Sequence, residues 1–159
     1  MSAGGSGALS TLASKRVQKE LLRFSEGDGT CELALEVVSP SCWQIAFVGP
    51  AGSIYAGESF KLKVEFTSDY PMDSPIVVFM QGGVPVHEHV YSNGHICLNI
   101  LGEDWSPALT VKSVVLSIVS MLSSATKKER PRDDARYSAT HGGSSNPKNT
   151  RFAYHDDAV

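Results

Sequence analysis

The sequence predicts an α+β fold, in which a four-stranded antiparallel sheet is preceded by one helix and followed by another. Three observations predict it: a helical apolar repeat near the N-terminus, consecutive period-two segments between residues 31 and 66, and a second helical repeat after residue 110. Short turns separate the period-two segments, which favours a meander of antiparallel strands. The 159 residues suffice for one domain with a sizeable core.

Composition excludes several classes of protein. Lys and Arg number 14 and Asp and Glu 17, so the net charge of −3 lacks the basic surplus of a dedicated nucleic-acid binder. A hydrophobic fraction of 42% argues against disorder throughout. The longest apolar stretch, 111–122, is shorter than the roughly 20 residues of a membrane span. The three cysteines are odd in number and no targeting segment is recognisable, so we expect a reducing compartment, cytoplasmic or nuclear.

The N-terminal helix is predicted over residues 14–24. Its apolar side chains recur at helical spacing, at Val17, Leu21 and Phe24, and the sequence EGDGT ends it. Residues 1–14 before it are uncharged and rich in Gly and Ser, which is typical of a flexible lead-in.

The strands are predicted by alternation of apolar and polar residues. ESFKLKVEF (58–66) is the clearest, because every second residue from Phe60 to Phe66 is apolar. CELALEVV (31–38) and WQIAFVG (43–49) alternate in the same way, with Leu33, Leu35 and Val37 expected on one face of the first. IVVFM (76–80) is the predicted fourth strand.

A long segment and a second helix complete the predicted domain. Residues 83–110 show no sustained period, and long irregular segments in compact domains are often functional. Thr110 then caps a helix whose apolar face comprises Val111, Val114, Val115, Ile118, Met121 and Leu122. The charged stretch 127–136 is expected to leave the core, and 138–150 breaks the helical pattern. We therefore predict a core domain over 15–140, which ends in a shortened C-terminal segment, and a polar tail over 141–159.

The stretch HEHVYSNGHIC (87–97) holds three of the five histidines and one of the three cysteines. One interpretation is a packed loop, in which Cys97 is a small buried residue and the histidines satisfy local hydrogen bonds. A second is a metal site formed by the histidines and Cys97, although the spacing matches no standard zinc pattern.

A third interpretation is a cysteine nucleophile. A thiolate attacks carbonyl carbon well, and a thiol ester keeps the acyl group reactive toward amines. The Asn93–Gly94 turn can direct Cys97 outward on a loop. The surroundings typical of papain-like proteases are absent, so proteolysis is not indicated.

Four motifs in this order resemble a ubiquitin-conjugating enzyme: KRVQKELL (15–22), YPMDSP (70–75), HEHVYSNGHICL (87–98) and WSPALT (105–110). The resemblance continues to the end of the second helix and covers most of the chain. The chain is similar to the W-type branch of this family in two respects, the H-x-H sequence at 87–89 and the tail FAYHDDAV at 152–159.

The resemblance implies an activity and its partners. Cys97 would accept ubiquitin as a thioester from the activating enzyme and pass it to an amine of a substrate held by a ubiquitin ligase of RING or U-box type. ATP is used by the activating enzyme, so we expect no bound cofactor and no metal. Lys15 and Lys19 would face the activating enzyme. The ligase surface would consist of Arg16, Met72, Pro107 and Ala108, although simple loop packing is an alternative for Met72 and Pro107.

The sequence departs from the usual family pattern in front of Cys97. His89 stands where most members have asparagine, and it would either donate a hydrogen bond to an oxyanion or brace the loop. Asn93 is a second candidate for loop support. His95 would either modulate the thiol or lie exposed on the surface.

The sequence also departs from the usual family pattern at the residues expected to lie near the incoming amine. Asn99 stands where an aspartate is common, and Asp133 and Asp134 follow extra residues (125–130) that are expected to shift them. An α-amine has a pKa near 8 against about 10.4 for lysine, so the neutral form is roughly 300-fold more abundant near pH 7 and needs less help from acids. This agrees with what the W-type resemblance implies, single ubiquitin attachment to flexible N-termini. The alternative is a catalytically weak adaptor of the same fold that binds ubiquitin or ligases.

Overall fold

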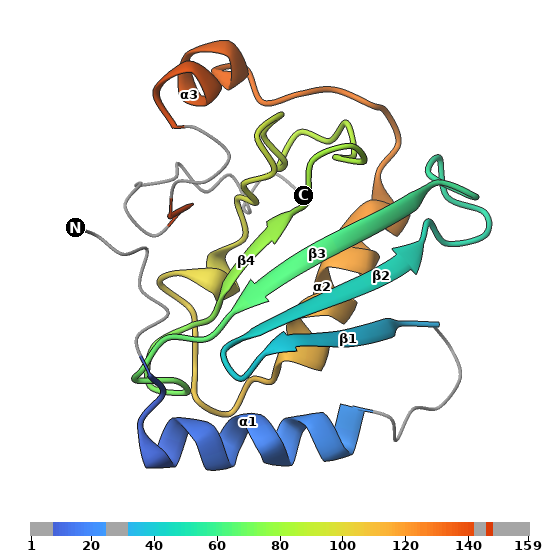
Figure 1. Ribbon diagram of the computed structural model, residues 1–159. Coiled ribbons are helices and arrows are strands. Elements are labelled where there is room, and N and C mark those ends of the chain that lie inside the picture. The colour runs from blue at the N-terminus through green and yellow to red at the C-terminus, as the bar shows by residue number, and fades with distance from the viewer. Residues whose placement is uncertain (1–7, 25–31, 142–145, 148–159) are drawn as a thin grey trace.

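The computed structural model describes residues 8–24, 32–141 and 146–147 (Figure 1). The predicted features at Cys31 and in the tail motif 152–159 lie outside the described residues. The elements are α1 (Thr11–Phe24), β1 (Ala34–Ser39), β2 (Cys42–Val48), β3 (Ser59–Glu65), β4 (Ile76–Phe79), the 3-10 helix η1 (Asn99–Leu101), α2 (Val111–Ser124) and α3 (Asp134–Thr140). The predicted α+β order of helix, antiparallel meander, long segment and central helix is confirmed.

Helix α1 begins earlier than predicted. The Ser10 hydroxyl accepts a hydrogen bond from the Ala13 backbone at 3.1 Å, which is an N-cap, so the end of the expected lead-in 1–14 is helical. Ala13 and Val17 are buried as the apolar repeat requires. Glu20 is buried as well, although it is charged.

The sheet has the order β1-β2-β3-β4, and every neighbouring pair is antiparallel. Strands β2 and β3 alternate as predicted, so that Trp43 pairs with Val64 and Ile45 with Leu62 on the buried face. Strand β1 begins at Ala34 and is the edge strand. Leu35 pairs with Ile45 and Val37 with Trp43, which agrees with the predicted shared face, although Val37 is 48% exposed.

Helix α2 packs behind the sheet and closes the core (Figure 1). Thr110 and Ser113 form a capping box at its start, as the sequence predicts for Thr110. Val119 joins the buried face, whereas Met121 is only partly buried. Helix α1 and the short helix α3 lie at opposite ends of the molecule (Figure 1). Among the described residues, no helix has the length and apolar character that a membrane crossing requires.

Candidate active site

The stretch around Cys97 folds into a small hairpin, residues 87–97. Isolated bridges pair Val90 with Ile96, and the Tyr91 backbone donates to the His95 carbonyl at 2.9 Å. Gly94 at its tip has φ of +95°, and a Cβ there would lie 2.2 Å from the Phe79 carbonyl oxygen. Only glycine therefore fits this turn against β4.

Cys97 occupies the end of this hairpin, 7% exposed. Its backbone N–H donates to the His89 carbonyl at 2.8 Å, so the second strand of the hairpin is held against the first. Within the described residues, no group of three or more histidine, cysteine or acidic side chains converges as a metal-ion site. The hairpin thus presents one thiol and no ligand cluster in the part of the chain that the structure describes.

His87 braces the strand before the cysteine, a role that the sequence interpretation did not assign. It is 4% exposed, and its Nδ1 accepts the His89 N–H at 2.9 Å. Burial, and secondarily the nearby His89, lower the pKa of His87 to about 4. His87 is therefore neutral at physiological pH, as an acceptor Nδ1 requires. His89 is only partly exposed, and its ring centroid lies 5.5 Å from that of His87.

Arg130 is a second residue that sequence reasoning missed. Its guanidinium donates to the carbonyls of Pro85 at 2.7 Å and Val90 at 3.2 Å. The buried Tyr55 hydroxyl donates to the Val86 carbonyl between them. The charged stretch 127–136 was expected to leave the core, but one of its arginines instead fixes the approach to the hairpin. The sequence of this charged run does not indicate which of its cationic side chains folds back onto the domain.

Asn93 and His95 lie inside the site. Asn93 is 8% exposed; its Oδ1 accepts the His95 N–H at 3.0 Å and its Nδ2 donates to the His141 carbonyl at 2.6 Å. These contacts are those of a loop support. His95 has no exposed surface, so the expectation of an exposed histidine is wrong. Its Nδ1 lies 2.6 Å from the Tyr137 hydroxyl.

The acidic residues expected to be shifted lie against the hairpin. The Tyr91 hydroxyl donates to Asp133 at 3.0 Å, and the Ser92 N–H donates to Asp134 at 2.7 Å. Burial, with the hydrogen bond to Asp133 second, raises the pKa of Tyr91. The segment 125–130 that precedes the two carboxylates is held near the hairpin by Arg130, whose guanidinium donates to the Pro85 carbonyl. Asn99, by contrast, donates its amide to Asp104 at 2.8 Å.

The residues predicted to bind the ligase lie near the α1 end. Arg16 makes an ion pair with Glu20 at 2.9 Å and donates to the Leu109 carbonyl at 2.8 Å. Pro107 and Ala108 are exposed, and with Arg16 and Lys19 they line a depression of about 260 Å³.

Two further predicted partner-binding residues are exposed. Met72 is 76% exposed, and its loop is held by the Trp105 indole, which donates to the Pro71 carbonyl at 2.8 Å. Lys15 is exposed on α1.

The arrangement at the α1 end depends on Glu20. Its carboxylate accepts from the Tyr70 hydroxyl and from the Val111 N–H, the latter at 2.8 Å, besides pairing with Arg16. One buried carboxylate therefore joins α1, the loop before β4 and the start of α2.

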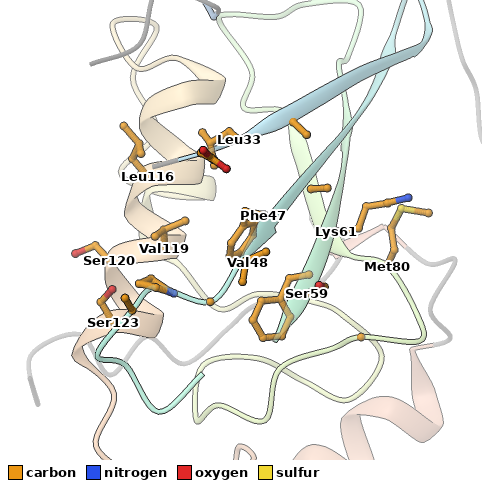
Figure 2. Close-up of a pocket in the computed structure, with 18 of the residues that line it drawn as sticks. Leu33, Phe47, Val48, Ser59, Lys61, Met80, Leu116, Val119, Ser120 and Ser123 are labelled. Atoms are coloured by element: carbon orange, nitrogen blue, oxygen red, sulfur yellow. The ribbon is translucent and has the colours of Figure 1, made fainter. Parts of the chain in front are cut away.

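A further hollow, about 1360 Å³ in volume, is lined by residues of α2, β2 and β3 (Figure 2). Leu116 and Val119 reach it from α2, and Phe47 reaches it from β2. It contains none of the predicted site residues.

Comparisons with known proteins agree with this geometry. The family model described as ubiquitin-conjugating enzyme matches residues 16–152. A probable ubiquitin-conjugating enzyme E2 W of Dictyostelium discoideum is 52% identical over 91% of this chain and 96% of its own length. A probable E2 W-A of Danio rerio is 50% identical over 90% of this chain and 95% of its own length.

Solved structures give the same result. The crystal structure of ubiquitin-conjugating enzyme E2 UbcA1 from Agrocybe aegerita matches with a TM-score of 0.79 and 42% identity, over 87% of this chain and 99% of that one. The resemblance on the four sequence motifs is therefore confirmed, and so is the class of enzyme, a ubiquitin transferase that works through a thioester. The chain belongs to the ubiquitin-conjugating enzyme family and matches its W branch.

Proposed function

We propose that Cys97 is the residue that carries ubiquitin as a glycyl thioester and transfers it to the N-terminal α-amino group of a substrate, with a RING or U-box ligase. The observation that carries this proposal is the place of Cys97 at the end of a hydrogen-bonded hairpin, with Asp133 hydrogen-bonded to Tyr91 of the same hairpin. The other described cysteine lies outside this hairpin. Cys42 lies in β2, and burial raises the pKa of its thiol, which lowers the thiolate fraction.

The chemistry has two acyl transfers. The Cys97 thiolate attacks the C-terminal carbonyl carbon of ubiquitin, which the activating enzyme holds in activated form. A new thioester forms on Cys97, and the group that linked ubiquitin to the activating enzyme leaves. A neutral amine then attacks the thioester carbonyl, the tetrahedral oxyanion collapses, Cys97 leaves as thiolate and the amine loses a proton. His89 is our candidate donor to the oxyanion. Asn93 supports the loop, since both ends of its amide are already hydrogen-bonded.

The proposed acceptor preference rests on the hydrogen bonds that already engage the polar groups near the hairpin. Asn99 replaces a usual aspartate, and its amide is bonded to Asp104. Asp133 already accepts a hydrogen bond from the Tyr91 hydroxyl. An α-amine, about 300-fold more often neutral near pH 7, needs less of this help. Substrates would be proteins with flexible N-termini, which reach the thioester without a folded docking surface.

Two surfaces would receive the other enzymes of the pathway. Lys15 and Lys19 on α1 would face the activating enzyme. Arg16, Met72, Pro107 and Ala108 would receive the ligase, and the exposed Met72 side chain is the apolar contact of that surface. We also expect a cytoplasmic or nuclear location and no bound cofactor.

The thioester is tested by charging. The protein is incubated with activating enzyme, ATP and ubiquitin, and a reductant-sensitive adduct is sought on a gel. The Cys97→Ala variant should lose the adduct, and the matched Cys42→Ala variant should keep it. No adduct on the wild-type protein would sink the proposal and favour an adaptor. Loss of the adduct on adding a chelator to the purified protein before charging would favour a metal site.

The amine preference is tested by discharge. Charged protein is mixed with one of two peptides of the same sequence, one with a free α-amine and no lysine, the other N-acetylated with one lysine. We expect faster loss of the thioester with the free α-amine. Equal rates, or faster discharge onto lysine, would contradict the N-terminal preference while leaving thioester transfer intact.

A further inference from the structure

The segment that follows α2 covers one side of the hairpin, and its contacts come from a short stretch of chain. Asp133 accepts from Tyr91, and Asp134 accepts from the Ser92 backbone. The Ser92 and Ser138 hydroxyls are 2.9 Å apart. Residues 133–141 therefore touch the first part of the hairpin turn at several points.

The centre of this contact is aromatic and buried. The Tyr137 ring stacks on Tyr91 at 3.8 Å and on His141 at 4.3 Å between centroids. Its hydroxyl lies 2.6 Å from Nδ1 of His95, and its ring meets the imidazole edge-on at 5.5 Å. Tyr137 is 6% exposed and His95 0%. A hydrogen bond in such a dry site is strong and fixes both partners.

His95 connects this contact to the thiol. His95 and Cys97 are two residues apart on one strand of the hairpin, so they move together if the strand shifts. The strand is held by its pairing with Tyr91 and by the Cys97 N–H bond to His89. Loss of the Tyr137 hydroxyl would remove the hydrogen bond to the His95 ring, while the contacts of Asp133 and Asp134 with the hairpin remain, so the change acts on the strand that carries Cys97.

We propose that Tyr137 is a positioning residue for ubiquitin transfer, which acts through His95 to fix the orientation of Cys97 relative to the incoming amine. The proposal rests on thioester transfer at Cys97 and does not depend on which amine is preferred. Attack on a thioester demands close alignment of nitrogen, carbonyl carbon and sulfur, and small misplacements of a reacting group slow such steps strongly. Charging takes place with the activating enzyme bound around the cysteine, so we expect it to be less sensitive.

The test uses the full chain in a ligase-free, single-turnover discharge. Tyr137→Phe keeps the ring stack and removes the hydroxyl; His95→Gln removes the imidazole; the double variant joins them. Tyr70→Phe is the matched control, a buried tyrosine whose hydroxyl bonds to Glu20 at the α1 end. Each protein is charged, the activating enzyme is stopped, and discharge is followed over a series of peptide concentrations, with whichever amine the wild-type protein accepts faster.

We expect Tyr137→Phe to lower the plateau discharge rate about tenfold, with the half-saturating peptide concentration and the extent of charging unchanged. The double variant should be no slower than the slower single variant, because the two residues act as a pair. A Tyr137→Phe plateau within about twofold of wild type, or an equal loss in Tyr70→Phe or in charging, would overturn the proposal. Failure of the wild-type protein to charge would sink the proposed function and this inference together, whereas normal charging with normal Tyr137→Phe discharge sinks the inference alone.

Discussion

The two ends of the molecule are stabilised in different ways. At the α1 end, one buried carboxylate, Glu20, accepts hydrogen bonds from three parts of the chain. At the cysteine end, many contacts come from aromatic rings and amides, among them Tyr137, His95 and Asn93. At the end expected to receive partners, one charged group therefore joins several elements, whereas the support of the end expected to do chemistry is distributed over more side chains.

We expect the largest change in stability from a substitution at the tip of the hairpin, at the cysteine end. Gly94→Ala should lower the free energy of unfolding by about 3 kcal/mol or more, because the new Cβ meets the Phe79 carbonyl oxygen at 2.2 Å and the backbone has φ of +95°. The control is Gly57→Ala, where φ is +81° but no atom lies within 4 Å, so only about 1 kcal/mol should be lost. Denaturant melts measure both. Equal losses would show that the close approach to β4 is unimportant.

The next largest change in stability is expected at Glu20, the buried carboxylate of the α1 end. Glu20→Ala should cost about 3 kcal/mol of stability, because it leaves buried donors of Tyr70 and Val111 unsatisfied. Gln18→Ala, on an exposed position of the same helix, should change stability by less than about 0.5 kcal/mol. Urea midpoints of the two variants provide the measurement. A Glu20→Ala loss below about 1 kcal/mol would mean that the α1 end does not depend on this group.

Acid should weaken the cysteine end through His87. Its pKa is lowered to about 4 in the fold from the ordinary histidine value of 6.5, so the unfolded chain takes up the proton first as pH falls. The contribution of neutral His87 to the free energy of unfolding is fully present above about pH 6.5 and is lost progressively down to about pH 4. At pH 4.5 this loss amounts to about 2 kcal/mol.

The measurement is the difference in unfolding free energy between pH 7 and pH 4.5, taken for wild type, His87→Gln and His89→Gln. His87→Gln should reduce this difference strongly, and His89→Gln should reduce it less, because His89 is only the second cause of the lowered pKa of His87, after burial. An unchanged pH difference in His87→Gln would show that other groups carry the acid sensitivity.

How much of each region could be predicted from sequence depends on the range of its contacts. The alternation in β3 and the cap at Thr110 are local, so periodicity and residue type predicted them. The pairing of His95 with Tyr137 spans 42 residues and leaves no periodic trace. Arg130 lies 45 residues from Pro85 in a run of charges that resembles any solvated loop. Val37 carried the right pattern for burial but lies on an edge strand, which the pattern does not reveal.

The smallest effect on stability is expected at the exposed surface predicted to bind the ligase. Met72 is 76% exposed, so Met72→Ala should change the unfolding free energy by less than about 0.5 kcal/mol. It should nevertheless weaken ligase binding about tenfold, since a methionine side chain buried at an interface contributes about 1–2 kcal/mol. Leu12→Ala removes a side chain with 77% exposure on α1 outside the predicted ligase surface, and is the matched control. Titration of a RING domain against each variant decides the matter, because equal affinities would remove Met72 from that surface and leave loop packing as its role.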